Sequence, residues 1–236
     1  MSRWLCVLCV IGGTSMLVHA GTPVDTASLI RQRIMKAYGA DRFQDIDAFT
    51  YTFNIQSGDR KVKRVWTWEP KRGCVTFHGK GPAGSIIDYS YTHTKTDTSD
   101  TTLDTYVDQR FINDNYWLFF PFHLAWDSNL VYNTTGVILS PELGNAEHLV
   151  VRYTGGGYTP GDMYVLFPDA MGLLRWWVFY RGAKEDQGSM MTWDDPIRVG
   201  PITLSTSHRN TDGTFKLWFS DIAFKLHGDD KWIKAQ

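Results

Sequence analysis

Cysteine is scarce in this chain, and two of the three cysteines lie close to the N-terminus. Cys6 and Cys9 fall within the first twenty residues, which leaves Cys74 as the single thiol of residues 21–236. Those residues therefore cannot form an internal disulfide, even in an oxidising compartment. Their stability must come from a buried core, and roughly 215 residues suffice for one all-β domain. We expect a single domain over residues 21–236.

The chain also lacks an excess of charge of either sign. It carries 24 Lys and Arg residues against 25 Asp and Glu residues. Removal of the first twenty residues takes away Arg3 alone, which leaves 23 basic and 25 acidic residues and a net charge of −2. A chain with this charge balance lacks the excess of positive charge that favours binding to a polyanion or an anionic membrane surface. We therefore expect no nucleic-acid partner.

Short motifs of catalysis, phosphate binding and metal binding are absent as well. No Gly-x-Ser-x-Gly occurs, and no Gly-Lys-Ser/Thr follows the run of glycines at residues 155–157. Cys74 and His78 would share a strand face about 13 Å apart, too far to act together. The histidines beyond residue 20 show no metal-binding spacing; they are His78, His93, His123, His148, His208 and His227. The sequence thus predicts no catalytic residue, no metal site and no cofactor.

The first twenty residues are typical of a cleaved secretory signal. Arg3 supplies a positive start, an apolar run spans residues 4–11, and small side chains stand at Val18 and Ala20. The apolar run is about half as long as a membrane span requires, so we expect no transmembrane anchor in the mature chain. The sequence predicts export to the periplasm, with the extracellular medium as the alternative destination.

Helical periodicity begins just after this segment. Asp25 or Thr26 can cap a helix that ends at Gly39. The apolar positions of this helix share one face, as in an amphipathic helix; they are Ala27, Ile30, Ile34, Ala37 and Tyr38. We expect that face to pack on the rest of the protein.

Farther along the chain, the apolar residues recur at every second position, as in half-buried β-strands. Four such runs joined by short turns predict an antiparallel meander over residues 49–55, 62–69, 74–78 and 87–93. The residues Ser57, Gly58 and Asp59 supply the first of these turns. Further strands are expected at residues 130–139, 147–154, 163–167, 172–180, 197–207 and 214–226.

The segment from Phe111 to Trp126 is unusually dense in large apolar side chains. Asn113 or Asp114 can cap a short helix there, and Pro121 limits or kinks it. So many large side chains must be buried or must cover an apolar surface. We therefore expect an α+β protein that is mainly β: one strongly curved antiparallel sheet of roughly nine to eleven strands, a half-barrel with helices covering its concave face.

Two motifs resemble those of an uncharacterised family of exported bacterial proteins. They are FINDNYWLFFPFHL at residues 111–124 and GGYTPGD at residues 156–162. That family is similar in fold to outer-membrane lipoprotein carriers of the LolA/LolB-like superfamily. The resemblance implies a half-barrel with a helical lid that shields acyl chains and that an arginine holds in place. No arginine stands in a matching motif, since Arg64, Arg152 and Arg175 all lie on expected strands.

The resemblance and the aromatic content favour a carrier or binding protein for a lipid, a lipoprotein acyl chain or another apolar molecule. Pockets lined with rings are usual for small ligands, although burial in a core explains the same side chains. The candidate cavity wall and lid consist of Trp66, Trp68, Tyr89, Tyr91, Trp117, Phe119, Phe120, Tyr158 and Trp176.

Two alternatives from other classes remain open. One is an enzyme that acts on a small or glycan-like substrate at the same concavity, with candidate polar residues Asp88, His93, Asp162 and Arg175. The other is an interaction module that offers its aromatic face to an envelope protein partner. Turnover with a bell-shaped pH dependence would distinguish the first, and partner-dependent stability the second.

Overall fold

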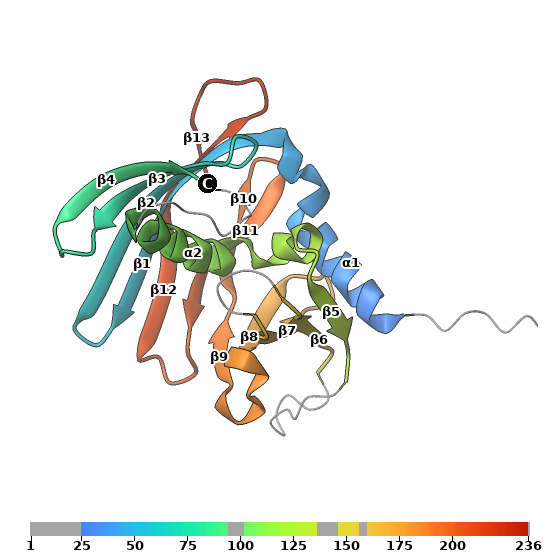
Figure 1. Ribbon diagram of the computed structural model, residues 1–236. Coiled ribbons are helices and arrows are strands. Elements are labelled where there is room, and N and C mark those ends of the chain that lie inside the picture. Colours follow the sequence, from blue (N-terminus) through green and yellow to red (C-terminus); the bar gives the residue numbers. More distant parts are fainter. Residues whose placement is uncertain (1–24, 94–101, 136–145, 156–159, 236) are drawn as a thin grey trace, which may run out of the picture.

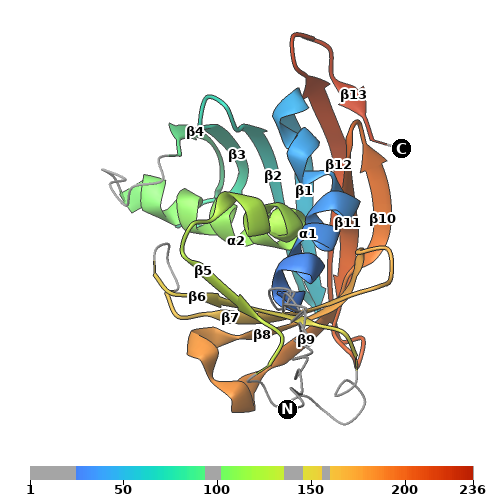
Figure 2. The same ribbon diagram turned by 90° about the vertical axis from the view of Figure 1, so that its right-hand side faces the viewer.

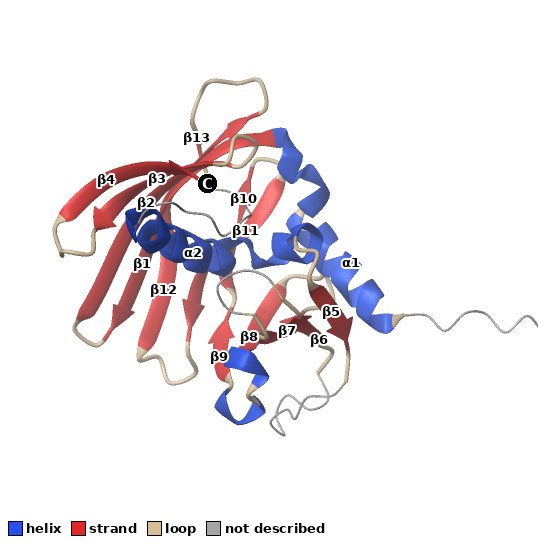
Figure 3. Cartoon of the chain, viewed as in Figure 1, coloured by secondary structure: helices blue, strands red, loops and turns tan. Residues whose placement is uncertain are grey.

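The computed structural model describes residues 25–93, 102–135, 146–155 and 160–235. In this part of the chain the protein is mainly β, with two α-helices and two antiparallel sheets (Figure 1). The helices are α1 (Thr26–Tyr38) and α2 (Thr102–Trp126), and three short 3-10 helices are η1 (Ala40–Asp45), η2 (Arg181–Ala183) and η3 (Glu185–Gln187). Figure 3 separates the helices from the strands by colour.

Sheet A has eight strands, seven of them in the order β10-β11-β12-β1-β2-β3-β4, with β13 paired to β12. Their bounds are β1 (Ile46–Ser57), β2 (Arg60–Glu69), β3 (Cys74–Lys80), β4 (Ile86–Thr92), β10 (Asp194–Val199), β11 (Ile202–Arg209), β12 (Phe215–Leu226) and β13 (Ile233–Lys234). Sheet B has the order β5-β6-β7-β8-β9. Its strands are β5 (Leu130–Asn133), β6 (Leu149–Tyr153), β7 (Met163–Pro168), β8 (Leu174–Tyr180) and β9 (Ser189–Thr192).

Helix α1 confirms the prediction made from periodicity. The Asp25 carboxylate accepts a hydrogen bond from the Ser28 amide at 3.3 Å, which satisfies one amide of the first turn. Gly39 ends the helix in the left-handed conformation, with φ of 74°. The apolar face is buried as expected, at Ala27, Ile30, Ile34 and Tyr38.

The meander of strands β1 to β4 is confirmed as well. β1 ends at Ser57 and β2 begins at Arg60, so the predicted turn residues form the hairpin. Across β2, β3 and β4, Trp66 stands opposite Phe77 and Phe77 opposite Tyr89. A second row joins Trp68, Val75 and Tyr91 in the same way. Alternation and tight turns are local properties, so the sequence alone can specify this register.

The prediction of one continuous curved sheet is wrong, because the described strands form two sheets. The chain passes from β9 to β10 through Trp193 and leaves one sheet for the other. Sheet B also buries a second apolar cluster on its far face, which includes Val150, Val165 and Val178. The half-barrel is not confirmed either, since neither sheet is strongly curled or closed (Figures 1 and 2).

Helix α2 is longer than the sequence predicted. It runs for 25 residues, and Pro121 lies inside it rather than at its end. A proline within a helix removes one hydrogen bond and is normally costly. Here the four apolar neighbours of Pro121 are fully buried and stabilise the continuous helix; they are Phe119, Phe120, Phe122 and Leu124. The solvated loop predicted before Thr102 lies outside the described residues.

Candidate functional site

Helix α2 crosses the face of sheet A, with sheet B beneath it (Figures 1 and 2). Every residue from 118 to 124 is buried, so this part of the helix is enclosed on all sides. Residues 102–117, called the outer half of α2 below, instead bury one face at Val107, Phe111 and Asp114 and expose the opposite one. Separation of the outer half from sheet A would therefore disturb the core between the two sheets less than separation of residues 118–124.

The outer half of α2 lies on an aromatic surface, called the ring face below, formed by Trp66, Trp68, Tyr89 and Tyr91 of β2 and β4. Phe111 of α2 contacts Trp66 and Trp68, with ring centroids 5.5 and 5.7 Å apart. Trp66 is fully buried, whereas the other three ring-face residues are half-buried. Side chains of the helix and the sheet thus meet directly, and a ligand at this place would have to displace part of α2.

A buried ion pair joins the outer half of α2 to the same strands. Arg64 of β2 binds both oxygens of Asp114, with Nε to Oδ2 at 2.7 Å and Nη2 to Oδ1 at 2.6 Å. The Trp66 indole also donates to Asp114 Oδ2 at 2.8 Å. The Asp114 side chain is fully buried. Burial raises the pKa of the Asp114 carboxyl, and the Arg64 guanidinium opposes that shift.

A second polar contact holds the start of α2 against the edge strand β4. Asp108 accepts hydrogen bonds from the Tyr91 hydroxyl at 2.7 Å and the His93 ring at 2.6 Å. Tyr89 donates to Asp104 one turn earlier. The ring-face tyrosines therefore present an apolar body to the helix and a polar tip to its carboxylates. Together with Arg64 and Asp114, these groups set the register of the helix on the sheet.

The other end of α2 is held by a separate network. Arg31 of α1 donates through Nε and Nη2 to the Leu124 carbonyl, at 2.9 and 2.6 Å. Asp127 accepts from the hydroxyls of Tyr116 and Tyr153, both at 2.9 Å. Burial alone would raise the pKa of Asp127, but hydrogen bonds from His123 and the tyrosines lower it overall. This network anchors the enclosed part of the helix and, through Tyr116, the last turn of the outer half.

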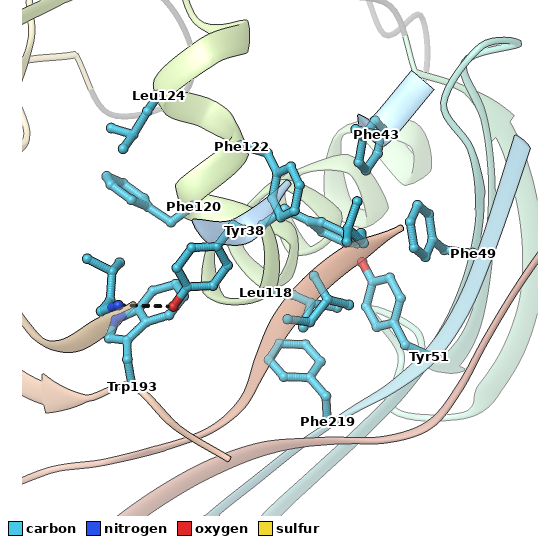
Figure 4. Close-up of a cluster of buried hydrophobic side chains, with 14 of the residues drawn as sticks. Tyr38, Phe43, Phe49, Tyr51, Leu118, Phe120, Phe122, Leu124, Trp193 and Phe219 are labelled. Carbon is cyan, nitrogen blue, oxygen red and sulfur yellow. Dashed lines mark hydrogen bonds between the residues drawn. The ribbon is translucent and has the colours of Figure 1, made fainter. Parts of the chain in front are cut away.

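Trp117 is the last residue of the outer half and contacts a further group of aromatic side chains. This group, called the tryptophan cluster below, consists of Trp117, Trp177, Trp193 and His208. The ring centroids of Trp117 and Trp177 are 4.7 Å apart, and those of Trp193 and His208 are 4.6 Å apart. The ring centroids of Trp177 and Trp193 are 5.3 Å apart, so the four side chains form one continuous cluster. It sits where strands β8, β10 and β11 approach α2. Figure 4 shows Trp193 among the buried hydrophobic side chains of the core.

The structure brings together most, but not all, of the residues predicted to line a cavity. Trp66, Trp68, Tyr89 and Tyr91 form the ring face, and Trp117 lies at the end of the outer half. Phe119 and Phe120 are on the enclosed part of α2, where both are fully buried. Tyr158 lies outside the described residues.

Trp176 faces away from these residues. It packs on the second apolar cluster of sheet B, while its neighbour Trp177 points toward α2. A register shift places Trp176 opposite Phe167 but Leu174 opposite Pro168, so one extra residue interrupts the alternation of β8. A bulge of this kind moves the following side chains to the other face of a strand. Because of this bulge, Trp176 lies on the face of sheet B away from Trp66 and Trp68.

The polar residues suggested for an enzyme are not brought together. Asp88 is exposed and pairs with His78, while His93 pairs with Asp108. Asp162 accepts a hydrogen bond from the Gly182 amide, and Arg175 pairs with Asp169. Within the described residues, no group of three or more His, Cys, Asp or Glu side chains could hold a metal ion. No described helix is long and apolar enough to cross a membrane.

The site is thus an aromatic sheet face beneath a helix that buries one of its faces. No protein-family model and no curated protein matches the chain. Among solved structures it is similar to a DUF1329 family protein from Desulfovibrio piger, with a TM-score of 0.45 and 10% identity, over 87% of this chain and 96% of that one.

A second solved structure is a putative outer membrane lipoprotein-sorting protein domain from Vibrio parahaemolyticus. Its TM-score is 0.37 at 10% identity, over 85% of this chain and 95% of that one. The two neighbours are thus a DUF1329 family protein and a lipoprotein-sorting domain, in line with the resemblance stated from the sequence.

Proposed function

We propose that the protein is an exported carrier that holds a lipid, an acyl chain or another apolar molecule between the outer half of α2 and the ring face. The observation that carries this proposal is the one-sided burial of residues 102–117 over four aromatic side chains. Residues 1–20 would be removed on export to the periplasm, and residues 21–236 would act as one carrier domain.

Binding of a ligand there would replace contacts of α2 with contacts of the ligand. Phe111 would give up its contacts with Trp66 and Trp68, and an acyl chain would make equivalent contacts with the same rings. Each methylene that leaves water contributes about 0.8 kcal/mol. The cost is the separation of Arg64 from Asp114, a directional contact that opposes gradual displacement of the helix. The outer half would therefore have two positions, closed as described here and open with ligand.

The proposal can be tested by replacing Trp117 at the end of the outer half of α2 and, as a control, Trp176 on the far face of sheet B. Both tryptophans are half-buried; Trp117 packs on Trp177, and Trp176 packs on the second apolar cluster of sheet B. We expect each alanine variant to lose about 2 kcal/mol of unfolding free energy, somewhat less than for a fully buried aromatic residue. Trp117→Ala should also weaken the binding of N-phenyl-1-naphthylamine, an apolar fluorescent dye, by about 10-fold or more, equivalent to about 1.4 kcal/mol.

Trp176→Ala is the matched control, because Trp176 packs on the second apolar cluster of sheet B, away from α2 and the ring face. Its dye affinity should stay within about 3-fold of the unchanged protein, less than 1 kcal/mol. Dye titrations and urea denaturation of both variants supply the comparison. Equal losses of affinity in the two variants would show that the rings act only as core, and the proposed binding place would be wrong.

A further inference from the structure

Three ring nitrogens of the tryptophan cluster are buried and lack a hydrogen-bond partner among the described residues. They are Nε1 of Trp177, Nε1 of Trp193 and Nε2 of His208. Buried polar atoms are nearly always paired, because an unpaired one loses its hydration without compensation. Three such atoms on side chains in mutual contact are unusual, and two of them are indole N–H donors.

The third atom is an acceptor. His208 Nδ1 lies 2.9 Å from the Thr192 carbonyl oxygen. A carbonyl can only accept, so Nδ1 carries the proton, and Nε2 of the neutral ring has a free lone pair. Burial keeps the ring neutral, since it lowers the pKa of His208 to about 4. At neutral pH the cluster therefore offers two donors and one acceptor.

Helix α2 adds a second acceptor beside His208. The Trp117 carbonyl would normally accept from the amide four residues later, but that residue is Pro121, which has no N–H. The His208 ring faces the Trp117 backbone. Two acceptors cannot bond to each other, but each could accept from a group that donates hydrogen bonds.

We propose that the tryptophan cluster is the polar end of the ligand site, and that the ligand has an uncharged head that both donates and accepts hydrogen bonds, such as an amide or a hydroxyl. This inference rests on the proposed carrier function and specifies its ligand class. The head would accept from Trp177 and Trp193 and donate to His208 or to the Trp117 carbonyl. Its chain would extend along the ring face.

The charges around the cluster favour an uncharged head over an anionic one. The charge that acts on His208 is that of the Asp194 carboxylate, which Arg209 already binds at 2.8 Å. A carboxylate or phosphate head would thus be buried near a like charge and without a cation of its own. The cluster is also continuous with the ring face, because Phe219 contacts both His208 and Tyr51, and Tyr51 stands opposite Trp66.

The test compares two probes with the same acyl chain, oleoyl ethanolamide with its uncharged amide and hydroxyl, and oleate with its carboxylate. Isothermal titration of the mature protein should show oleoyl ethanolamide binding about 10-fold more tightly or better. Trp193→Phe and Trp177→Phe keep a ring but remove one N–H donor each. Each variant should reduce the preference for oleoyl ethanolamide over oleate to about 3-fold or less, mainly because oleoyl ethanolamide binds more weakly.

Trp232→Phe is the control, since Trp232 is exposed just before β13 and packs under Lys225; it should leave both affinities unchanged. In protein labelled with ¹⁵N at the indoles, the Trp177 and Trp193 N–H signals should shift on adding oleoyl ethanolamide. Equal binding of both probes with unmoved indole signals would overturn the inference and leave the carrier function standing. Failure of both probes to bind would overturn the carrier function with it.

Discussion

Asp114→Ala is expected to lower the free energy of unfolding by about 3–5 kcal/mol, because it leaves the Arg64 guanidinium largely buried without its partner. The Trp66 indole loses its acceptor in the same variant. Urea denaturation monitored by circular dichroism would measure the loss. A change below about 1 kcal/mol, as for a surface ion pair, would contradict the role assigned to this contact.

The double variant Arg64→Met/Asp114→Leu is the informative control. Apolar side chains of similar size remove both charges at once, so no charge remains buried. We expect most of the lost stability to return, to within about 2 kcal/mol of the unchanged protein, with the Trp66 N–H as the group left unpaired. This result would show that the ion pair positions α2 on the sheet rather than supplying net stability.

Acidification is expected to destabilise the protein through His208 by about 3 kcal/mol between pH 6.5 and pH 4. Burial lowers the pKa of His208 from 6.5 to about 4, so in this window the unfolded chain binds a proton that the folded protein does not. The stability is therefore complete above pH 6.5 and is lost as the pH falls toward 4. Urea denaturation at a series of pH values would follow it.

His208→Gln isolates this contribution, because glutamine cannot take up the proton. The unfolding free energy of this variant should fall less steeply with decreasing pH than that of the unchanged protein. The two slopes should differ by about 1.4 kcal/mol per pH unit, the value for one proton. Other groups that titrate in this range affect both proteins alike. Parallel curves for the two proteins would mean that folded His208 takes up its proton over the same pH range as in the unfolded chain, so that burial does not keep its ring neutral.

The sequence predicted those parts of the fold that local chemistry determines. The Asp25 cap, the Gly39 end and the buried face of α1 follow from neighbouring residues. The β1–β4 register follows from alternation and from the turn at Gly58. The division into two sheets could not be predicted, because it depends on where the chain turns at Trp193. Alternation also gave no sign of the bulge beside Arg175.

The sequence predicted the aromatic part of the candidate site but not its ion pair. The ring face was predicted from alternating aromatic residues, but the partner of Asp114 was not, since Arg64 is fifty residues away. A signal was present: Asp114 shares a helical face with Phe111 and Leu118, and a carboxylate on a buried apolar face needs a cation. Trp193 and His208 gave no comparable signal, because tertiary packing alone brings them to Trp117.

The most direct test of the carrier function is native mass spectrometry of the mature protein, purified from its own cell envelope without detergent. The account predicts a reproducible added mass that organic extraction removes, and fragmentation should identify an uncharged molecule with an acyl or other apolar chain. The Trp117→Ala protein prepared in parallel should carry less of it. A mass equal to that of the bare chain, in protein that also fails to take up the apolar dye and both oleoyl probes, would contradict the account.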